Sequence, residues 1–340
     1  MTTRLFILLS LFLCFPASAK DSFKVCWSHY VGWEPWHYVD TSGTLKRWAE
    51  KYGIDVSIER VDDYVDSLER FTNGEFDACT MTQMDALAFP VAQGVDTSVL
   101  IVGDYSNGND GLVSHEAKTV PDIKGSNVLL VKYSVSHYLL NRALSKSKMT
   151  ENDVEIVDTS DALILEAFSK DKGVNMVTWN PILQRAVGET DANVLFDSSQ
   201  LPGEILDVMV VKTGGDERLN KVLVGAWFEV MEKLQREDKA VLSAMAESAG
   251  VTLVSIIKQL DATKMFYSPR KAVRIAQSNS LFKAMNNVRA FCFEQGLMGD
   301  IEDVDALGIS FPSGKVLGDS ENIKLRFDSR YMEMAVNNQL

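Results

Sequence analysis

The densest group of side chains suited to ligand recognition lies between residues 27 and 38. Its sequence, WSHYVGWEPWHY, holds three of the chain's six tryptophans, two tyrosines and two of its four histidines. An apolar strand is expected before it, over 23–27, and an amphipathic helix after it, over 41–53. The aromatic residues then lie on a loop at the carboxyl end of a strand, where open α/β sheets bind their ligands. We therefore expect Trp33, Glu34 and Trp36 to contact a ligand. The alternative is a hydrophobic cluster that closes the end of the sheet.

The other candidate ligand-binding residues also lie where expected strands end or helices begin. They are Gln83, Asp85, Asn109, Asp110, Ser136, His137, Trp179 and Asn180. No candidate is a lysine or an arginine, whereas three are carboxylic acids and three are tryptophans. Carboxylates pair with a guanidinium group through two hydrogen bonds, and indole faces attract cations, at ~0.5 to 2 kcal/mol for each contact. The set therefore favours a small planar cation, with uncharged urea as a close competitor.

Two features leave other interpretations of this set open. A helix is expected to begin at Ser134 to His137, and the free N–H groups of a helix N-terminus bind anions such as nitrate or a sulfonate. Asp85 also begins an expected helix, where an aspartate is a suitable cap whatever the ligand. An anion ligand, and a purely structural Asp85, are thus the alternatives.

Neither a metal site nor a catalytic set is expected. His29, Glu34 and His37 are close in sequence, but their spacing matches neither a helical i, i+4 pair nor a zinc signature. Ser136 and His137 would have to act as nucleophile and base from one helical turn, which rarely gives the required geometry. The sequence contains no G-x-S-x-G elbow and no phosphate-binding loop. We therefore expect a binding protein without a cofactor, and a secreted enzyme is the alternative.

The elements that position these residues form two successive α/β units. From residue 23 to residue 103 the expected order is β-α-β-α-β-α-β, which requires crossover connections and a parallel sheet. The pattern restarts after residue 112, and a last strong strand covers 206–211. Beyond this strand the sequence is mainly helical, and the tail from Gly314 is polar and weakly patterned.

The first 19 residues have the features of a secretory signal peptide: a basic start, an apolar run too short to span a bilayer and an Ala-x-Ala cleavage site. Arg4 is the one charged side chain that cleavage removes, so 33 lysines and arginines remain against 47 aspartates and glutamates. This acidic balance argues against nucleic acid or an anionic membrane as a partner. Three cysteines remain, Cys26, Cys79 and Cys292, so at least one thiol is free. A disulfide between Cys26 and Cys79 is left open.

Several motifs resemble those of a known family. The strings VPDIKG, SVSHYLL and WNP, which begin at residues 120, 134 and 179, resemble periplasmic substrate-binding proteins of the nitrate, sulfonate and taurine class of ABC importers. The strings GWEPW, SGTLKRWAEKYGI and TQMDAL more closely resemble the subgroup associated with urea carboxylase, whose transporters are described as urea or guanidine importers. The resemblance covers about residues 20 to 300.

The resemblance implies a two-lobed α/β fold of the type II periplasmic-binding class, with a hinge and a helical C-terminal region. The first lobe would comprise 20–112 and the return segment 208–340, and the second lobe 113–207. The protein would be a periplasmic monomer that closes on a small nitrogenous molecule, such as guanidine or urea, and delivers it to an ABC permease in the inner membrane. A sulfonate, nitrate or thiamine-precursor-like ligand is the alternative within the same class.

Overall fold

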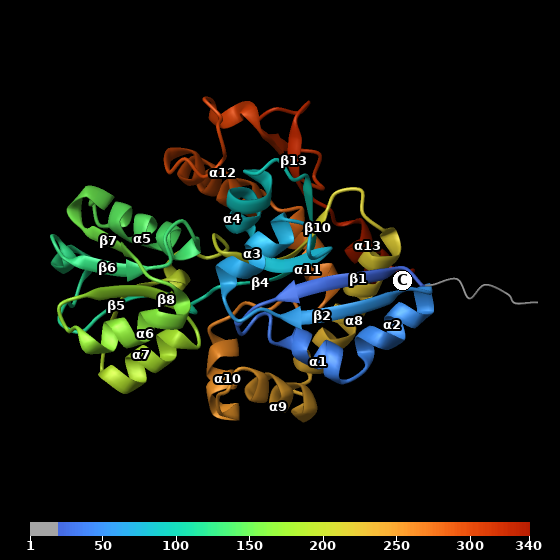
Figure 1. Cartoon of the computed structure of the whole chain (residues 1–340), viewed down its shortest axis with the longest axis horizontal. Helices are drawn as coiled ribbons and strands as arrows, with labels where there is room; N and C mark the ends of the chain where they lie inside the picture. The colour runs from blue at the N-terminus through green and yellow to red at the C-terminus, as the bar shows by residue number, and fades with distance from the viewer. Residues whose placement is uncertain (1–19) are drawn as a thin grey trace, which may run out of the picture.

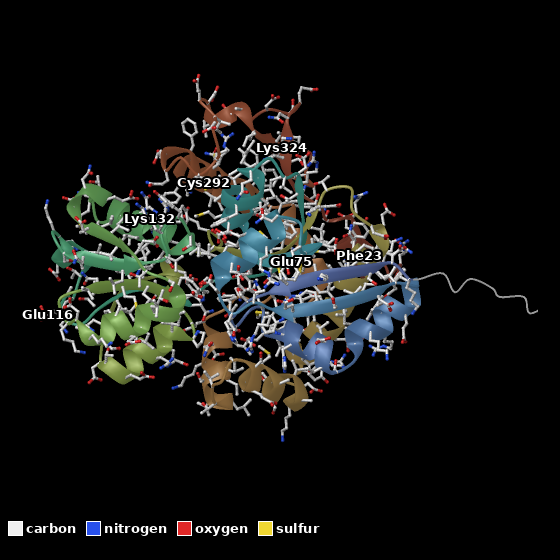
Figure 2. All side chains as sticks on the ribbon, viewed as in Figure 1. Phe23, Glu75, Glu116, Lys132, Cys292 and Lys324 are labelled. Carbon is white, nitrogen blue, oxygen red and sulfur yellow. A yellow bond between two sulfur atoms is a disulfide. The ribbon has the colours of Figure 1, made fainter. Side chains whose placement is uncertain are left out.

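The computed structural model describes residues 20–340, so the expected signal peptide lies outside the described residues. The chain forms two lobes, each built on one β-sheet with helices on its faces (Figure 1). In the view with all side chains drawn, Phe23 and Glu75 lie on the first lobe, and Glu116 and Lys132 on the second (Figure 2). Within the described residues, no single helix is long and apolar enough to cross a membrane. One pair of helices, Lys239–Ser248 and Leu253–Asp261, has the required length and composition when counted together, but the pair is bent by 98°.

The first lobe contains an eight-stranded sheet in the order β12-β11-β13-β4-β10-β3-β1-β2. The bounds of its strands are β1 Ser22–Trp27, β2 Asp55–Arg60, β3 Ala78–Thr82, β4 Thr97–Tyr105, β10 Leu206–Lys212, β11 Gly308–Ser310, β12 Val316–Leu317 and β13 Ile323–Phe327. The central strands are buried along nearly their whole length, as expected for a sheet covered by helices on both faces.

The second lobe contains a five-stranded sheet in the order β7-β6-β8-β5-β9. Its strands are β5 Asp110–Ser114, β6 Asn127–Leu130, β7 Glu155–Asp158, β8 Asn175–Trp179 and β9 Asn193–Asp197. Strands β6, β7 and β8 are parallel, and β5 runs antiparallel to both of its neighbours. The second α/β unit, expected after residue 112, is therefore present as a sheet of its own.

Thirteen α-helices cover the sheets of residues 20–340. Their bounds are α1 Pro35–Thr41, α2 Thr44–Tyr52, α3 Tyr64–Thr72, α4 Gln83–Ala86, α5 Val135–Lys146, α6 Asp161–Lys170, α7 Ile182–Thr190, α8 Glu217–Gln235, α9 Lys239–Ser248, α10 Leu253–Asp261, α11 Pro269–Ala276, α12 Asn279–Glu294 and α13 Arg330–Val336. Helices α5 to α7 belong to the second lobe, and the long α8 follows the return of the chain to the first lobe (Figure 1).

Local sequence signals explain several helix ends. Gly53 ends α2 in the left-handed conformation, with φ of 69°, as the sequence predicts. The Ser134 hydroxyl caps α5 by accepting a hydrogen bond from Ser136 N at 3.1 Å. The prediction for 41–53 was wrong at its start, because the chain forms two helices there and Gly43, without a side-chain cap, precedes the second.

One prediction for the first sheet was wrong. The sheet is not all parallel, because β10 runs antiparallel between β3 and β4 and separates them. The weakly patterned tail beyond Gly314 contributes β13 to the sheet beside β4, and α13 packs against α11. The pairings of β10 and β13 with β4 join segments more than 100 residues apart, which a local pattern does not encode.

Two chain segments join the lobes. The first links β4 to β5, and the second runs from the short helix Ser198–Gln200 into β10. They are held side by side, because Ser106 N donates to Ile205 O at 3.0 Å and the Ser106 and Ser198 hydroxyls lie 2.6 Å apart.

The second connection is tied to both lobes at Glu204. Its carboxylate accepts hydrogen bonds from Tyr138 Oη at 2.6 Å and from Arg142 Nε at 2.8 Å, both on α5 of the second lobe. Its backbone carbonyl accepts a hydrogen bond from Gln83 Nε2 of the first lobe at 2.5 Å. Glu204 therefore links the two lobes at the point where the chain returns.

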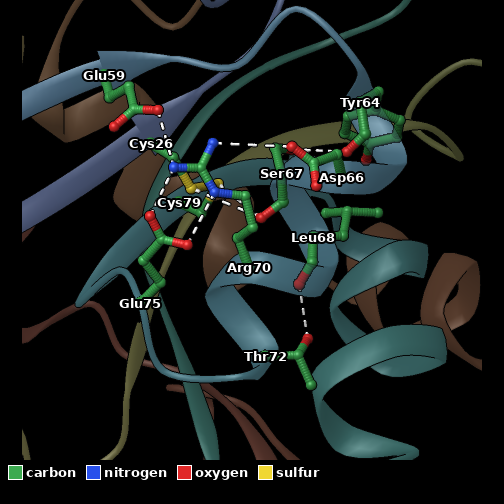
Figure 3. Close-up of a disulfide and its surroundings, with 10 residues drawn as sticks. All are labelled: Cys26, Glu59, Tyr64, Asp66, Ser67, Leu68, Arg70, Thr72, Glu75 and Cys79. Atoms are coloured by element: carbon green, nitrogen blue, oxygen red, sulfur yellow. Dashed lines mark hydrogen bonds and ion pairs between the residues drawn. A yellow bond between two sulfur atoms is a disulfide. The ribbon is translucent and has the colours of Figure 1, made fainter.

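Cys26 and Cys79 form a disulfide between the neighbouring strands β1 and β3, where they are directly opposite in the register (Figure 3). The close-up shows Arg70 beside this bond, with Glu59 and Glu75 as its partners. Cys292 is the free cysteine of the described chain, and burial raises the pKa of its thiol. The disulfide that the sequence left open is therefore formed.

Candidate functional site

A cavity lies between the two lobes of the described chain. The volume open to the centre of a water-sized sphere is about 20 Å³, room for about one water molecule, so the cavity is narrow in this conformation. Its lining residues are Tyr30, Trp33, Tyr64, Thr82, Asp110, Val135, Trp179, Ile205 and Asp207. Thr82 and Asp207 come from strands of the first sheet, and Asp110 and Trp179 from paired positions on β5 and β8 of the second. Both lobes are therefore needed to complete the cavity.

Aromatic rings form much of the wall. The ring centroids of Tyr30 and Trp33 are 5.2 Å apart, those of Trp33 and Tyr64 are 5.5 Å apart, and those of Tyr64 and Trp179 are 6.0 Å apart. These spacings and the tilted or edge-on angles are those that aromatic quadrupoles favour. Four rings in such a chain surround a small ligand with π faces and edges, which is the arrangement that binds organic cations.

Two carboxylates line the cavity, Asp110 and Asp207, and both are nearly fully buried, at 3% exposed. Burial raises the pKa of Asp110 to about 7. Burial, together with the charges of Asp104 and Asp110, raises the pKa of Asp207 well above its usual range. No lysine, arginine or histidine of residues 20–340 is part of the lining. The cavity therefore offers acids that a cationic ligand can ionise, without a resident counter-ion in the lining among residues 20–340.

A third acid, Asp85, lies behind the wall and orients it. Asp85 Oδ2 accepts hydrogen bonds from Tyr64 Oη and Thr82 Oγ1, both at 2.6 Å. The Tyr64 oxygen in turn accepts a hydrogen bond from Thr82 N at 3.0 Å. Burial raises the pKa of Asp85 to about 6, against the lowering effect of the two hydroxyl donors. Thr82 caps α4, because its hydroxyl accepts a hydrogen bond from Asp85 N at 3.1 Å. The Asp85 carboxylate therefore holds the Tyr64 ring in place and is not part of the cavity lining.

Three of the residues predicted from the sequence line the cavity: Trp33, Asp110 and Trp179. The Trp33 indole N–H is buried and has no hydrogen-bond partner among the residues that the structure describes. The Trp179 indole N–H donates to His29 O at 3.4 Å across the two lobes. Their contact with a ligand stays a prediction, which their position supports.

Trp36 and Glu34 were predicted to face a ligand, and the structure places both away from the cavity lining. Trp36 lies in α1, is 1% exposed and stacks on Trp227, with ring centroids 4.9 Å apart. Glu34 is also 1% exposed, and its Oε1 lies 2.8 Å from His29 Nδ1. For Trp36 the reason is Pro35, which begins a helix at its first position and turns the following residues into the core. Glu34 precedes this helix and is held by its contact with His29.

Three amides in the predicted set hold the lobes and their connections together instead of lining the cavity. Gln83 Oε1 accepts a hydrogen bond from Leu206 N at 2.7 Å, next to the contact of Gln83 with Glu204 described above. Asn180 Nδ2 donates to Asn109 Oδ1 at 2.6 Å, and Asn109 Nδ2 donates to Ala262 O at 2.8 Å. These amide side chains therefore form hydrogen bonds with other groups of the protein.

Ser136 and His137 also lie outside the lining, within the first turn of α5. Ser136 is fully buried. The His137 ring packs edge-on against Phe291, with centroids 5.3 Å apart, and its Nε2 lies 3.3 Å from Glu151 Oε2. Because the Ser134 hydroxyl already accepts a hydrogen bond from Ser136 N, one of the N–H groups proposed to bind an anion is occupied.

Sequence reasoning missed several lining residues. Tyr30 belongs to the aromatic segment but is not among the predicted ligand contacts, and neither is Tyr64, which begins α3. Asp207 was placed inside a strong apolar strand, LDVMVV, without a role. An acid flanked by apolar residues in a buried strand is itself a signal, because a buried charge needs a partner or a function.

The fold resembles that of known periplasmic binding proteins. The aliphatic sulphonate-binding protein SsuA of Escherichia coli matches with a TM-score of 0.67 at 17% identity, over 82% of this chain and 94% of that chain. SsuA of Xanthomonas axonopodis pv. citri, bound to MOPS, matches with a TM-score of 0.67 at 17% identity, over 83% and 96%. A periplasmic sulfonate-binding protein from Methylobacillus flagellatus KT matches with a TM-score of 0.69 at 12% identity, over 94% of each chain.

These structural matches confirm the expected α/β fold of a periplasmic binding protein with a helical C-terminal region. No curated protein matches the sequence. A model of the family described as NMT1/THI5 like matches residues 43–250, which is more than half of the chain and includes both connections between the lobes. The chain therefore belongs to the NMT1/THI5-like family.

Proposed function

We propose that this protein is the periplasmic solute-binding component of an ABC importer and that it binds a small organic cation of the guanidinium class in the cavity between its lobes. In this proposal it acts as a monomer, releases the ligand unchanged to an inner-membrane permease and catalyses no reaction. The observation that carries the proposal is a cavity walled by four aromatic rings and two buried aspartates, with no basic side chain of the described chain in its lining.

The chemistry of this lining matches a planar cation. A guanidinium group donates two parallel hydrogen bonds to one carboxylate, and its faces stack on aromatic rings. A cation held against an aromatic face in a desolvated site gains ~2 kcal/mol. The cavity is narrow, with about 20 Å³ open to the centre of a water-sized sphere, which suits guanidine or a short derivative better than a long-chain compound.

The same lining argues against the anion alternative. The matched SsuA proteins are named for sulfonates, but in this chain a sulfonate would face Asp110 and Asp207 with no cationic partner in the lining among residues 20–340. The raised pKa values allow these acids to hold protons, but a sulfonate still finds no positively charged side chain among the described lining residues. Urea has the same donor geometry as guanidinium but lacks the charge, so it uses the hydrogen bonds without the electrostatic attraction.

A thermal-shift and calorimetry series tests the proposal. The protein of residues 20–340 is first unfolded, dialysed and refolded to remove any carried-over ligand. Guanidinium, methylguanidinium, urea, taurine and nitrate are then added at millimolar concentration. We expect stabilisation by the guanidinium compounds, of ~2.7 kcal/mol at 100 times the Kd. Mass spectrometry should recover the ligand unchanged.

Two variants sharpen the result. Asp207→Asn keeps the side-chain shape but removes one carboxylate from the lining, so guanidinium affinity should fall by tenfold or more, or about 1.4 kcal/mol. Asp96→Asn is the matched control, because Asp96 is a surface acid paired with Lys324 and lies outside the lining. Stabilisation by taurine or nitrate but not by guanidinium would contradict the proposal.

A further inference from the structure

The cavity acid Asp207 has a second acid, Asp104, directly behind it. The two residues are opposite each other on the antiparallel strands β4 and β10, and they are 0% and 3% exposed. Tyr30 Oη donates a hydrogen bond to Asp104 Oδ1 at 3.3 Å and also lies within hydrogen-bonding reach of Asp207. Opposed carboxylates on neighbouring strands repel one another when both are charged. This pair therefore needs either a proton or a cation between its members.

The surrounding backbone is shaped to admit this pair. A Cβ added at Gly32 would collide with the Asp104 carboxylate and with the Tyr30 ring. The glycine of the aromatic segment thus leaves the space that the second acid occupies. One oxygen of each acid, Asp104 Oδ2 and Asp207 Oδ2, is buried and accepts no hydrogen bond from a donor of residues 20–340. Such oxygens are costly unless a proton or a ligand satisfies them.

Among residues 20–340, the groups that shift the pKa values of the pair include no basic side chain. The titratable groups that act on it are acidic or phenolic: Tyr30 from the loop after β1, Asp110 from β5, Tyr64 from α3 and Tyr267 before α11. Burial raises the pKa of Asp104 to about 7 and raises that of Asp207 well above its usual range. Two neighbouring carboxylic acids in a dry site do not both ionise, so we expect the pair to share one proton.

We propose that the site exchanges this proton for its cationic ligand, with Asp104 as the positioning residue that makes the exchange possible. In the unliganded protein one carboxyl O–H bond between Asp104 and Asp207 holds the proton. When the cation enters, that O–H bond breaks, the proton leaves to solvent and the second carboxylate balances the ligand's charge. The charge of the site is the same before and after binding. This inference rests on the proposed function and goes beyond it, because it explains selection of a cation over neutral urea.

Proton exchange has a direct consequence for specificity. A permanent cation gains from the newly ionised acid, whereas urea leaves the pair protonated and binds without releasing a proton. Below the pKa of the unliganded pair, the Kd for guanidinium should fall about tenfold for each unit of pH increase, because one proton is lost per ligand bound. The Kd for urea, if it binds, should stay constant over the same range.

Isothermal titration calorimetry of residues 20–340 at pH 6.5, in buffers with different ionisation enthalpies, measures the number of protons released. We expect one proton or slightly more per guanidinium in the wild type, because Asp110 also has a raised pKa and releases part of a second proton. In Asp104→Asn, Asp207 no longer faces a second carboxyl group, so its pKa falls, although burial and Asp110 still raise it. Proton release at pH 6.5 should therefore be smaller than in the wild type, and the pH dependence should move to lower pH. Asp110→Asn is the comparison: it removes a cavity acid outside the pair, so affinity should fall and only the share of protons that Asp110 itself releases should be lost.

The outcomes separate the two proposals. Guanidinium binding with no proton release in the wild type at any pH from 5.5 to 7.5 overturns the exchange and leaves the proposed function standing. Loss of proton release in Asp110→Asn but not in Asp104→Asn also overturns it, because the proton would then belong to Asp110. Absence of guanidinium binding overturns both proposals. The wild-type measurement alone decides the question if Asp104→Asn does not fold.

Discussion

Truncation of Trp36 should destabilise the protein without removing ligand binding. Trp36 is 1% exposed and stacks on Trp227, so Trp36→Ala opens a large cavity between α1 and α8. Removing a buried tryptophan costs ~3 to 5 kcal/mol, and the lost ring pair adds ~0.5 to 1.5 kcal/mol. At about 2 °C per kcal/mol for a chain of this length, the melting temperature should fall by roughly 7 to 13 °C.

Circular dichroism during heating is the appropriate stability assay, because urea and guanidinium are candidate ligands and cannot serve as neutral denaturants. Calorimetry, run well below the lower melting temperature, then gives the Kd for guanidinium. For Trp36→Ala we expect a Kd within about threefold of the wild type, as for a residue outside the contact surface.

Trp33→Phe is the reciprocal variant, since Trp33 lines the cavity and keeps most of its ring volume on this change. Its stability should change by less than ~1.5 kcal/mol. Its guanidinium affinity should fall about fivefold, which corresponds to ~1 kcal/mol of weaker cation–π attraction. The reasoning is refuted if Trp36→Ala melts within about 2 °C of the wild type and loses tenfold or more in affinity.

Three further predictions concern stability and closure. Replacing Cys26 and Cys79 by alanine removes a bond that spans 53 residues, and this should lower the free energy of thermal unfolding by ~2 to 4 kcal/mol. A thiol reagent should label Cys292 only after denaturation, because this cysteine is buried. Labelling of the native protein would contradict its burial. Arg142→Met removes two of the hydrogen bonds to Glu204, which links the two lobes. Small-angle scattering of the unliganded variant should therefore show a larger radius of gyration than that of the wild type. An unchanged radius would count against Glu204 as the link between the lobes. Without ligand, the melting temperature should decrease as pH rises from about 4.5 to 7.5, because the buried aspartates hold protons in the folded state that the unfolded chain has already released; an increase over this range would show that their pKa values are not raised.

The sequence alone predicted the elements whose signals are local. The C-terminal glycine of α2, Gly53, and the cap of α5, Ser134, are set by the conformational and hydrogen-bonding preferences of single residues. Strand β8 ends at Trp179 as expected, because its apolar run stops there. The class of fold follows from the alternation of such segments, since parallel strands require crossover helices.

The tertiary structure decided which of these residues share a cavity. Trp33 and Trp36 are three residues apart, and only the start of a helix at Pro35 sends one toward the cavity and the other into the core. Asp207 meets Asp104 because β10 inserts between β3 and β4. Side-chain type predicts what a residue is able to bind, but the neighbours that define a site come from strands about 100 residues apart, and their pairing depends on the whole buried core.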